Sequence, residues 1–131
     1  MSGGGIDYLS GMTKILQYAG LGALAVLGTA AMFHNHLVKS SPGAGESLKA
    51  SPPEVMLWFN ERPEIPFTSV TLLTADSTKI VTIKAVKTDD SMAVAAPLAT
   101  PLKPGSYLVT WRTAGSDGHA IRGTYGFTIA P

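Results

Sequence analysis

The 131-residue sequence predicts an all-β fold, a seven-stranded sandwich or Greek-key barrel that follows an apolar N-terminal segment. Two observations support this. From residue 34 onward, alternating and β-branched runs are separated by clusters of Pro, Gly, Asp and Ser. The same part of the chain has no amphipathic helical stretch of useful length. Residues 15–33, in contrast, are uncharged and mostly apolar.

The expected strands are short and closely spaced, as in an antiparallel sandwich. Their aromatic side chains supply most of the bulky burial that a core of this size needs. The strands are His36–Ser40, Glu54–Phe59, Phe67–Thr74, Lys79–Lys84, Ser91–Ala96, Ser106–Arg112 and Gly123–Ile129, and the aromatics are Trp58, Phe59, Tyr107, Trp111, Tyr125 and Phe127.

Residues 1–33 are typical of an export signal. Lys14 precedes the apolar run, and Thr29-Ala30-Ala31 supplies the small residues that a signal peptidase accepts. The alternative is an uncleaved membrane anchor, because the run approaches the roughly 20 residues that span a bilayer. In both cases we expect residues 34–131 to form one domain outside the cytoplasm, since Lys14 favours the inner side.

Composition restricts the chemistry. The sequence has no cysteine, so it offers neither disulfides nor a thiolate metal site. A transition metal would need nitrogen, oxygen or methionine-sulfur ligands. The net charge of +1 and the scattered Lys and Arg residues argue against a nucleic-acid partner.

The three histidines lie at the two ends of the domain. His34 and His36 open it, and His119 follows Asp117 in the loop between the last two strands. Imidazole binds copper, nickel and zinc, and a carboxylate two residues away can join it from an extended segment. Gly118 gives the backbone freedom for a turn there.

We find no convincing catalytic set. Ser116, His119 and Asp117 leave a serine–histidine–acid arrangement open, but no G-x-S-x-G elbow supports it. No glycine-rich phosphate loop follows a strand. We therefore expect a protein that is not an enzyme.

Two segments resemble the CopC-type copper-resistance proteins. The first is His34-Asn35-His36-Leu37-Val38-Lys39-Ser40-Ser41-Pro42, followed by VMLWFNE over residues 55–61. The second runs from Leu102 through Trp111-Arg112 to Ser116-Asp117-Gly118-His119 and Gly123, and it is the more specific. The resemblance covers essentially all of residues 34–131.

This resemblance implies a cupredoxin-like, Ig-like Greek-key barrel in the periplasm. It implies one Cu(II) per chain, bound by the mature N-terminal amine and ring of His34 together with Asp117 and His119. His36 is a further possible ligand, and Glu61 matches an acidic position near the site. A Cu(I) methionine site is not expected, because the corresponding stretch contains only Met92 and Met56 reads as core.

The mature N-terminus decides the copper geometry. A cut before His34 would follow the bulky Phe33, whereas a cut after Ala31 leaves Met32-Phe33 ahead of His34. Either cut leaves a copper-binding N-terminus, and an uncut anchor leaves only the imidazoles.

The leading hypothesis is a periplasmic Cu(II) carrier or buffer in copper homeostasis and resistance, with a membrane copper transporter of the same system as a candidate partner. The alternatives are a membrane-tethered β-sandwich adaptor with incidental histidines and a histidine-brace copper monooxygenase. The membrane is a partner only if residues 15–33 stay uncleaved.

Overall fold

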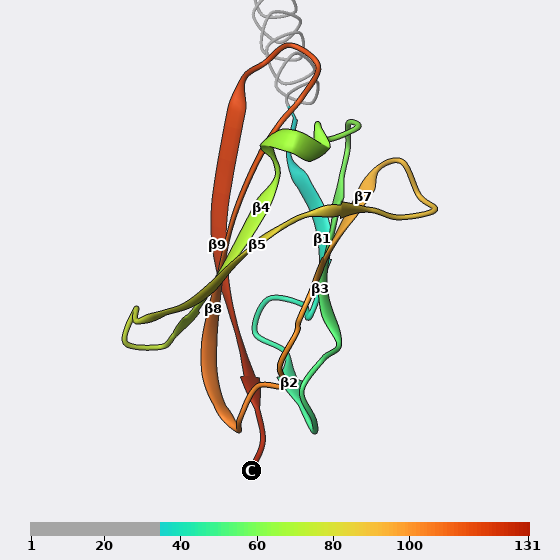
Figure 1. Ribbon diagram of the computed structural model, residues 1–131. Coiled ribbons are helices and arrows are strands. Elements are labelled where there is room, and N and C mark those ends of the chain that lie inside the picture. Colours follow the sequence, from blue (N-terminus) through green and yellow to red (C-terminus); the bar gives the residue numbers. More distant parts are fainter. Residues whose placement is uncertain (1–34) are drawn as a thin grey trace, which may run out of the picture. The chain divides into compact units, whose positions relative to one another are not determined.

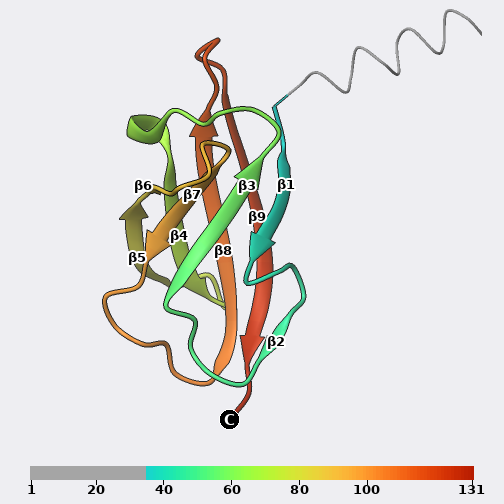
Figure 2. The ribbon, with the colours of Figure 1, turned by 90° about the vertical axis from the view of Figure 1, so that its right-hand side faces the viewer.

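A computed structural model describes residues 35–131, which form two β-sheets packed face to face (Figures 1 and 2). One sheet has four strands and the other has five. In spatial order, the first sheet contains β1 (Leu37–Ser41), β3 (Glu54–Phe59), β7 (Ala93–Pro97) and β6 (Val86–Lys87). The second contains β2 (Ser47–Leu48), β9 (Ala120–Ile129), β8 (Gly105–Ala114), β4 (Ser69–Thr74) and β5 (Lys79–Lys84). A single turn of 3-10 helix, η1 (Ile65–Phe67), precedes β4.

Alternation along the strands places the core between the sheets. In β3, Val55, Leu57 and Phe59 are buried, and the residues between them are only partly covered. Because successive side chains of a strand point to opposite faces, each strand gives one row to the core and one to the outer surface. Facing these residues, the five-stranded sheet contributes a second buried row: Val70, Leu72, Tyr107, Val109, Trp111, Phe127 and Ile129.

The β8–β9 hairpin is the longest paired unit of the described chain. It runs in unbroken antiparallel register from Gly105↔Ile129 to Ala114↔Ala120. Trp111 lies against Phe59 of the other sheet, edge to face, with ring centroids 5.4 Å apart. A side chain at Gly123, opposite Trp111, would place its Cβ 2.5 Å from the indole ring, so this position needs a glycine.

The all-β fold and all seven predicted strands are confirmed, with shifted ends. The predicted bounds of β3 and β5 match, whereas β8 and β9 extend further toward each other. The two-residue strands β2 and β6 were not predicted, because two residues are too short for a periodicity. Phe67 lies in η1 and not in a strand.

The prediction that Trp58 belongs to the core is wrong. Trp58 points away from the core in the alternation of β3 and is only partly covered. Its ring lies under the Lys39 ammonium, 4.5 Å from the nitrogen, which shields the outer face of β3.

The predicted signal or anchor over residues 1–33, with the start of the second domain at His34, lies outside the described residues. Within residues 35–131, no helix is long and apolar enough to cross a membrane.

Candidate metal centre

Three segments meet at one end of the sandwich. The β8–β9 loop, residues 115–119, is at this end, as is the point where residue 35 leads into β1 (Figures 1 and 2). Residues 60–64, which follow β3, close the same end, because the Glu64 amide donates to the Ala114 carbonyl at 2.9 Å. The ends of a sandwich carry its loops, so a functional site there does not disturb the core.

The loop is a tight turn and not the extended segment that the i, i+2 spacing suggested. The Gly118 amide donates to the Gly115 carbonyl at 3.0 Å, and Gly118 has a φ of +79°. This left-handed conformation favours glycine. The turn reverses the chain over residues 115–118, and the side chains of Asp117 and His119 contact each other just after it.

Asp117 and His119 form a closed local pair. The Oδ2 atom of Asp117 lies 2.9 Å from Nδ1 of His119, and its Oδ1 atom accepts the His119 backbone N–H at 3.1 Å. The His119 and Asp117 side chains are 87% and 63% exposed, respectively, so the pair is open to a ligand from solvent.

The contact between Asp117 and His119 shifts the pKa of both side chains. The hydrogen bond from the His119 ring, with a smaller one from its backbone N–H, lowers the pKa of Asp117 below its usual value. The same side-chain bond, reinforced by the carboxylate charge, raises the pKa of His119 above 6.5.

The hydrogen bond also selects the nitrogen that is available to a metal. A carboxylate only accepts, so Nδ1 of His119 carries the proton in this pair. In the neutral ring, Nε2 then holds the free lone pair. Metal-binding histidines commonly donate their other ring nitrogen to a carboxylate in this way.

Gly115 is where the chain's distant segments meet. A Cβ placed on Gly115 would lie 3.1 Å from Oε2 of Glu61, 3.4 Å from Nδ2 of Asn35 and 3.5 Å from Oδ1 of Asp117. Three polar groups from the N-terminal segment, the loop after β3 and the hairpin therefore surround one glycine. This places Glu61 beside the Asp117–His119 pair.

Asn35 is the polar residue that the sequence reasoning missed. Its Nδ2 and Oδ1 atoms are both buried and have no hydrogen-bond partner among the described residues. A buried amide without partners is costly, so each such group calls for an explanation. The only feature of the sequence that could have pointed to Asn35 was its position directly after His34, in the first segment that resembles the CopC proteins.

A buried hydroxyl network holds the loop's base. Thr113, fully buried, shares a 2.7 Å hydrogen bond with the Thr68 hydroxyl, which also lies 2.8 Å from the Glu64 carbonyl. These bonds join β8 to the segment between β3 and β4. The exposed tip therefore stands on a fixed base.

Of the two N-terminal histidines, the described residues include His36. His36 is exposed, and its backbone N–H donates to Oδ1 of Asn60 at 2.6 Å. Residues 35–131 contain no group of three His, Cys, Asp or Glu side chains arranged to hold a metal, so His36 is not brought together with Asp117 and His119. His34 lies outside the described residues.

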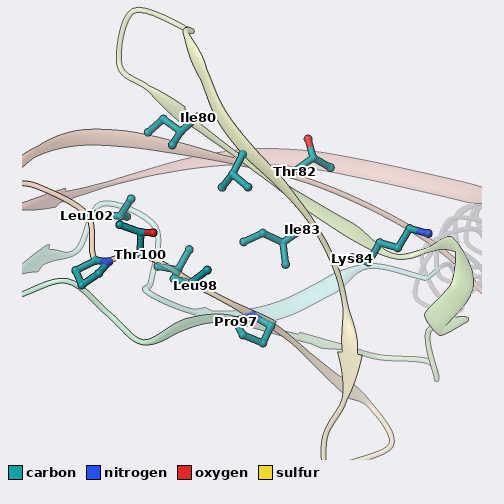
Figure 3. Close-up of a pocket in the computed structure, with 11 residues that line it drawn as sticks. Ile80, Thr82, Ile83, Lys84, Pro97, Leu98, Thr100 and Leu102 are labelled. Atoms are coloured by element: carbon teal, nitrogen blue, oxygen red, sulfur yellow. The ribbon is translucent and has the colours of Figure 1, made fainter.

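A separate apolar groove opens between β5 and residues 97–102 (Figure 3). It has a volume of about 540 Å³, and Ile83 and Leu98 face each other across it. Lys84 is the only ionisable residue in its lining, so the groove offers no metal ligands and no acid–base pair.

Comparison with known proteins places the chain in a family. The model of the CopC domain matches residues 37–130, nearly all of the described chain. The chain belongs to the CopC family. The family predicted from the two sequence segments is thus confirmed.

Its relatives include copper-resistance proteins. The chain is 33% identical to Copper resistance protein C of Escherichia coli, over 88% of this chain and 98% of that protein. It is also 33% identical to Protein YobA of Escherichia coli K12, over 92% and 99%. Copper transport protein CutJ of Bacillus subtilis is 31% identical, but the match covers only 18% of that longer protein.

Solved structures share the fold. The crystal structure of CopC from Methylosinus trichosporium OB3b matches with a TM-score of 0.69 and 34% identity, over 75% of this chain and 95% of that chain. PcoC from Escherichia coli, described as a methionine-rich copper-resistance protein, matches with a TM-score of 0.64 and 29% identity, over 73% and 98%. This chain, in contrast, has only Met56 and Met92 after residue 34.

Proposed function

We propose that this CopC protein is an exported, periplasmic Cu(II) carrier or buffer. It binds one Cu(II) per chain through His34, Asp117 and His119, and it carries out no catalytic turnover. Copper is cargo that is taken up and released. The copper-resistance and copper-transport names of its relatives support this proposal.

The observation that carries the proposal is the cluster around Gly115. Asn35 is bonded directly to His34, and its side chain lies beside the same glycine as Asp117. His34 directly precedes Asn35 in the sequence, which supports its assignment to the same site. The proposed ligands come from both ends of the domain, 83 to 85 positions apart.

The donor set suits Cu(II). An N-terminal amine, two imidazoles and a carboxylate are nitrogen and oxygen ligands of the kind that form tetragonal Cu(II) sites. Cu(II) also stands at the top of the divalent affinity series, so such a set binds Zn(II) more weakly. Asp117 can bind Cu(II) and keep its hydrogen bonds to His119, because each of its oxygens has a second lone pair beyond those bonds.

Two neighbours can assist the site without binding the metal. Glu61 adds negative charge beside Gly115, which favours a divalent cation. Asn35 has amide atoms that lack partners among the described residues, and they are available to hydrogen-bond a metal-bound group. His36 remains a further possible ligand if the mature chain begins at His34, because it would then be the third residue.

The test begins with the exported protein purified from its host. Intact mass fixes the N-terminus, and Cu(II) titration against a chelator, followed by electron paramagnetic resonance, gives stoichiometry, affinity and ligand type. We expect one equivalent with nitrogen-rich coordination and at least tenfold tighter binding than Zn(II), an order-of-magnitude expectation from the affinity series.

His119→Ala is the decisive variant, and Ser116→Ala in the same exposed loop is its control. We expect His119→Ala to lose one nitrogen ligand in the resonance spectrum and most of the copper-induced rise in Tm. Saturation at about 100 times the Kd would otherwise stabilise the fold by about 2.7 kcal/mol. If His119→Ala keeps both the spectrum and the rise, then the site is purely N-terminal.

A further inference from the structure

The outer face of the five-stranded sheet carries a row of cations across its strands. In the register, Lys84 of β5 is opposite Ser69 of β4, Ser69 is opposite Arg112 of β8, and Arg112 is opposite Arg122 of β9. Residues directly opposite one another project from the same face of a sheet. Arg112 stands between buried Trp111 and Thr113, so its own side chain points outward.

A row of hydroxyls lies immediately beside the cations. Thr82, Thr71, Thr110 and Thr124 continue the same four strands one outward position further along. Thr71 and Thr82 share a 3.0 Å hydrogen bond, and Thr110 and Thr124 share one of 3.1 Å, so these side chains lie on one face. We call the two rows together the cationic face. A shallow depression on this face is lined by Ser69, Thr71, Thr110, Trp111, Arg112 and Arg122.

Nothing within the described chain neutralises these charges. None of the residues in β2, β4, β5, β8 and β9 is Asp or Glu. Within residues 35–131, neither Arg112, Arg122 nor Lys84 forms an ion pair. Like charges directly opposite each other destabilise a sheet, so the Arg112–Arg122 pair costs stability that a partner's negative charge would recover.

We infer that the cationic face is a docking surface for a protein partner that presents an extended, carboxylate-rich segment. The inference goes beyond copper binding and does not depend on it. Guanidinium groups bind carboxylates through two parallel hydrogen bonds, and the neighbouring hydroxyls add further donors.

The geometry favours a segment with several carboxylates over a single small anion. Strands are about 4.8 Å apart, so the four-strand row extends over roughly 14 Å, too far for one phosphate to touch all three cations. Alternate side chains of an extended peptide recur at about 6.8 Å on one side, which long Lys and Arg side chains can match.

The chemistry of the face also favours a protein over a membrane. Surfaces that lie in a lipid headgroup layer combine basic residues with bulky apolar ones that enter the acyl boundary. The two rows contain only Lys, Arg, Ser and Thr. The exposed large apolar side chains of the described chain lie outside these two rows. Ile80 and Val81 of β5 line the apolar groove, and Val38, Phe67, Val86 and Met92 belong to other segments.

The position of the face gives docking a consequence. Arg122 is three residues from His119, and strands rise about 3.4 Å per residue, so a partner held there lies within roughly 10 Å of the Asp117–His119 pair. A partner that exchanges copper would need this proximity.

The test uses copper-free mature protein and a deca-glutamate peptide as the probe, with deca-glutamine as the uncharged control. Amide chemical shifts are followed at low salt and at 0.3 M NaCl. We expect deca-glutamate to shift amides of β4, β8 and β9, with an affinity that falls as salt rises. Deca-glutamine should shift none.

The variants compare the loss of equal charge at two places. Arg112→Gln with Arg122→Gln removes two charges from the cationic face, and Lys49→Gln with Lys103→Gln removes two exposed charges elsewhere. We expect the first pair to weaken deca-glutamate binding by about tenfold or more, since charge-assisted hydrogen bonds are lost, and the control pair by less than about threefold. Arg112→Lys, which keeps the charge but loses the planar fork, should fall between them.

The folded state of the arginine variant is checked by its amide spectrum and Tm, which we expect to be unchanged or higher because a like-charge pair is removed. Inorganic phosphate and vesicles containing phosphatidylglycerol are titrated in the same way as alternative ligands. The inference is overturned if deca-glutamate does not bind, binds elsewhere, or weakens equally in both double variants. Binding of phosphate or vesicles to this face at least as tight as that of the peptide also overturns it.

Discussion

The tip and the base of the β8–β9 hairpin differ sharply in how deeply their side chains are buried. At the tip, Asp117 and His119 are exposed and are held only by hydrogen bonds to each other. A few residues below, Trp111 and Thr113 are buried among side chains from the other elements. The difference teaches that the exposed polar pair and the packed core are separated along the hairpin. Changes at the base should therefore destabilise the protein, and changes at the tip should alter only the proposed copper binding.

The largest expected effect is at the base. Trp111→Ala should lower the free energy of unfolding by about 3–5 kcal/mol, because it removes a buried aromatic and leaves a cavity. Trp58→Ala is the matched control. Since Trp58 lies on the outer face under Lys39, its loss should cost about 1 kcal/mol or slightly more. Urea unfolding measures both, and equal losses would contradict the assignment of the two tryptophans to opposite faces.

A smaller loss is expected where Trp111 covers Gly123. Gly123→Ala should destabilise by about 1–3 kcal/mol, because the new Cβ would overlap the indole ring. Gly126→Ala, on the same strand, meets its nearest atom at 3.4 Å and should change stability by less than about 1 kcal/mol. Thermal unfolding separates the two, and a neutral Gly123→Ala would show that the ring moves freely.

The hydroxyl network should matter less. Thr113→Val removes one buried hydrogen bond while Thr68 keeps its bond to the Glu64 carbonyl, so we expect a loss of about 1 kcal/mol. Thr110→Val, which breaks an exposed hydroxyl pair on the same strand, should have a smaller effect. A Thr113→Val protein with unchanged Tm would mean that the network does not support the loop.

The smallest effect on stability is expected at the tip. Asp117→Asn removes the carboxylate whose hydrogen bond and, to a smaller extent, charge raise the pKa of His119, so that pKa should fall toward 6.5 with little change in Tm. Titration of the His119 ring by nuclear magnetic resonance, in copper-free protein, measures it. A pKa that stays where it is in the parent protein would mean that the pair does not form in solution.

The pH dependence follows from the two opposite shifts. The raised pKa of His119 gives a contribution that is present below the unfolded-state value and is lost as pH rises through the folded-state pKa. The lowered pKa of Asp117 gives one that is present above its unfolded value and is lost as pH falls through its folded-state pKa. Both act between the usual values of 3.8 and 6.5, and solvent screening keeps them small. The proposed copper binding, in contrast, should weaken as pH falls through the His119 pKa, because protonation occupies Nε2.

Local patterns predicted most of the fold. The alternation in EVMLWF and KIVTIK sets β3 and β5, because burial of one face imposes a period of two. Alternation alone does not say which aromatic faces inward, so Trp58 was misplaced while Phe59 next to it is buried. The two-residue strands depend on partners distant in sequence, such as Ser47 with Thr128, which local pattern does not contain.

The candidate site, like the fold, could be predicted only in part from local sequence. Asp117 and His119 are two residues apart, so the sequence could suggest their pairing. The pair forms through a turn with Gly118 at positive φ, however, and not along an extended backbone. Asn35 and Glu61 reach Gly115 only through the packing of the two sheets, so no spacing rule connects them. Their grouping could be suggested only by resemblance to a family.

The sheet edges bear on how the protein behaves when it is concentrated. Of the four edge strands, β2 and β6 have only two residues each, which leaves little unpaired backbone for another chain to join. The other two, β1 and β5, each contain a register shift. Lys39 adds a positive charge to β1, and Lys79 and Lys84 add one at each end of β5. These features disfavour intermolecular strand pairing at every edge, so we expect the concentrated domain to resist aggregation through its sheets.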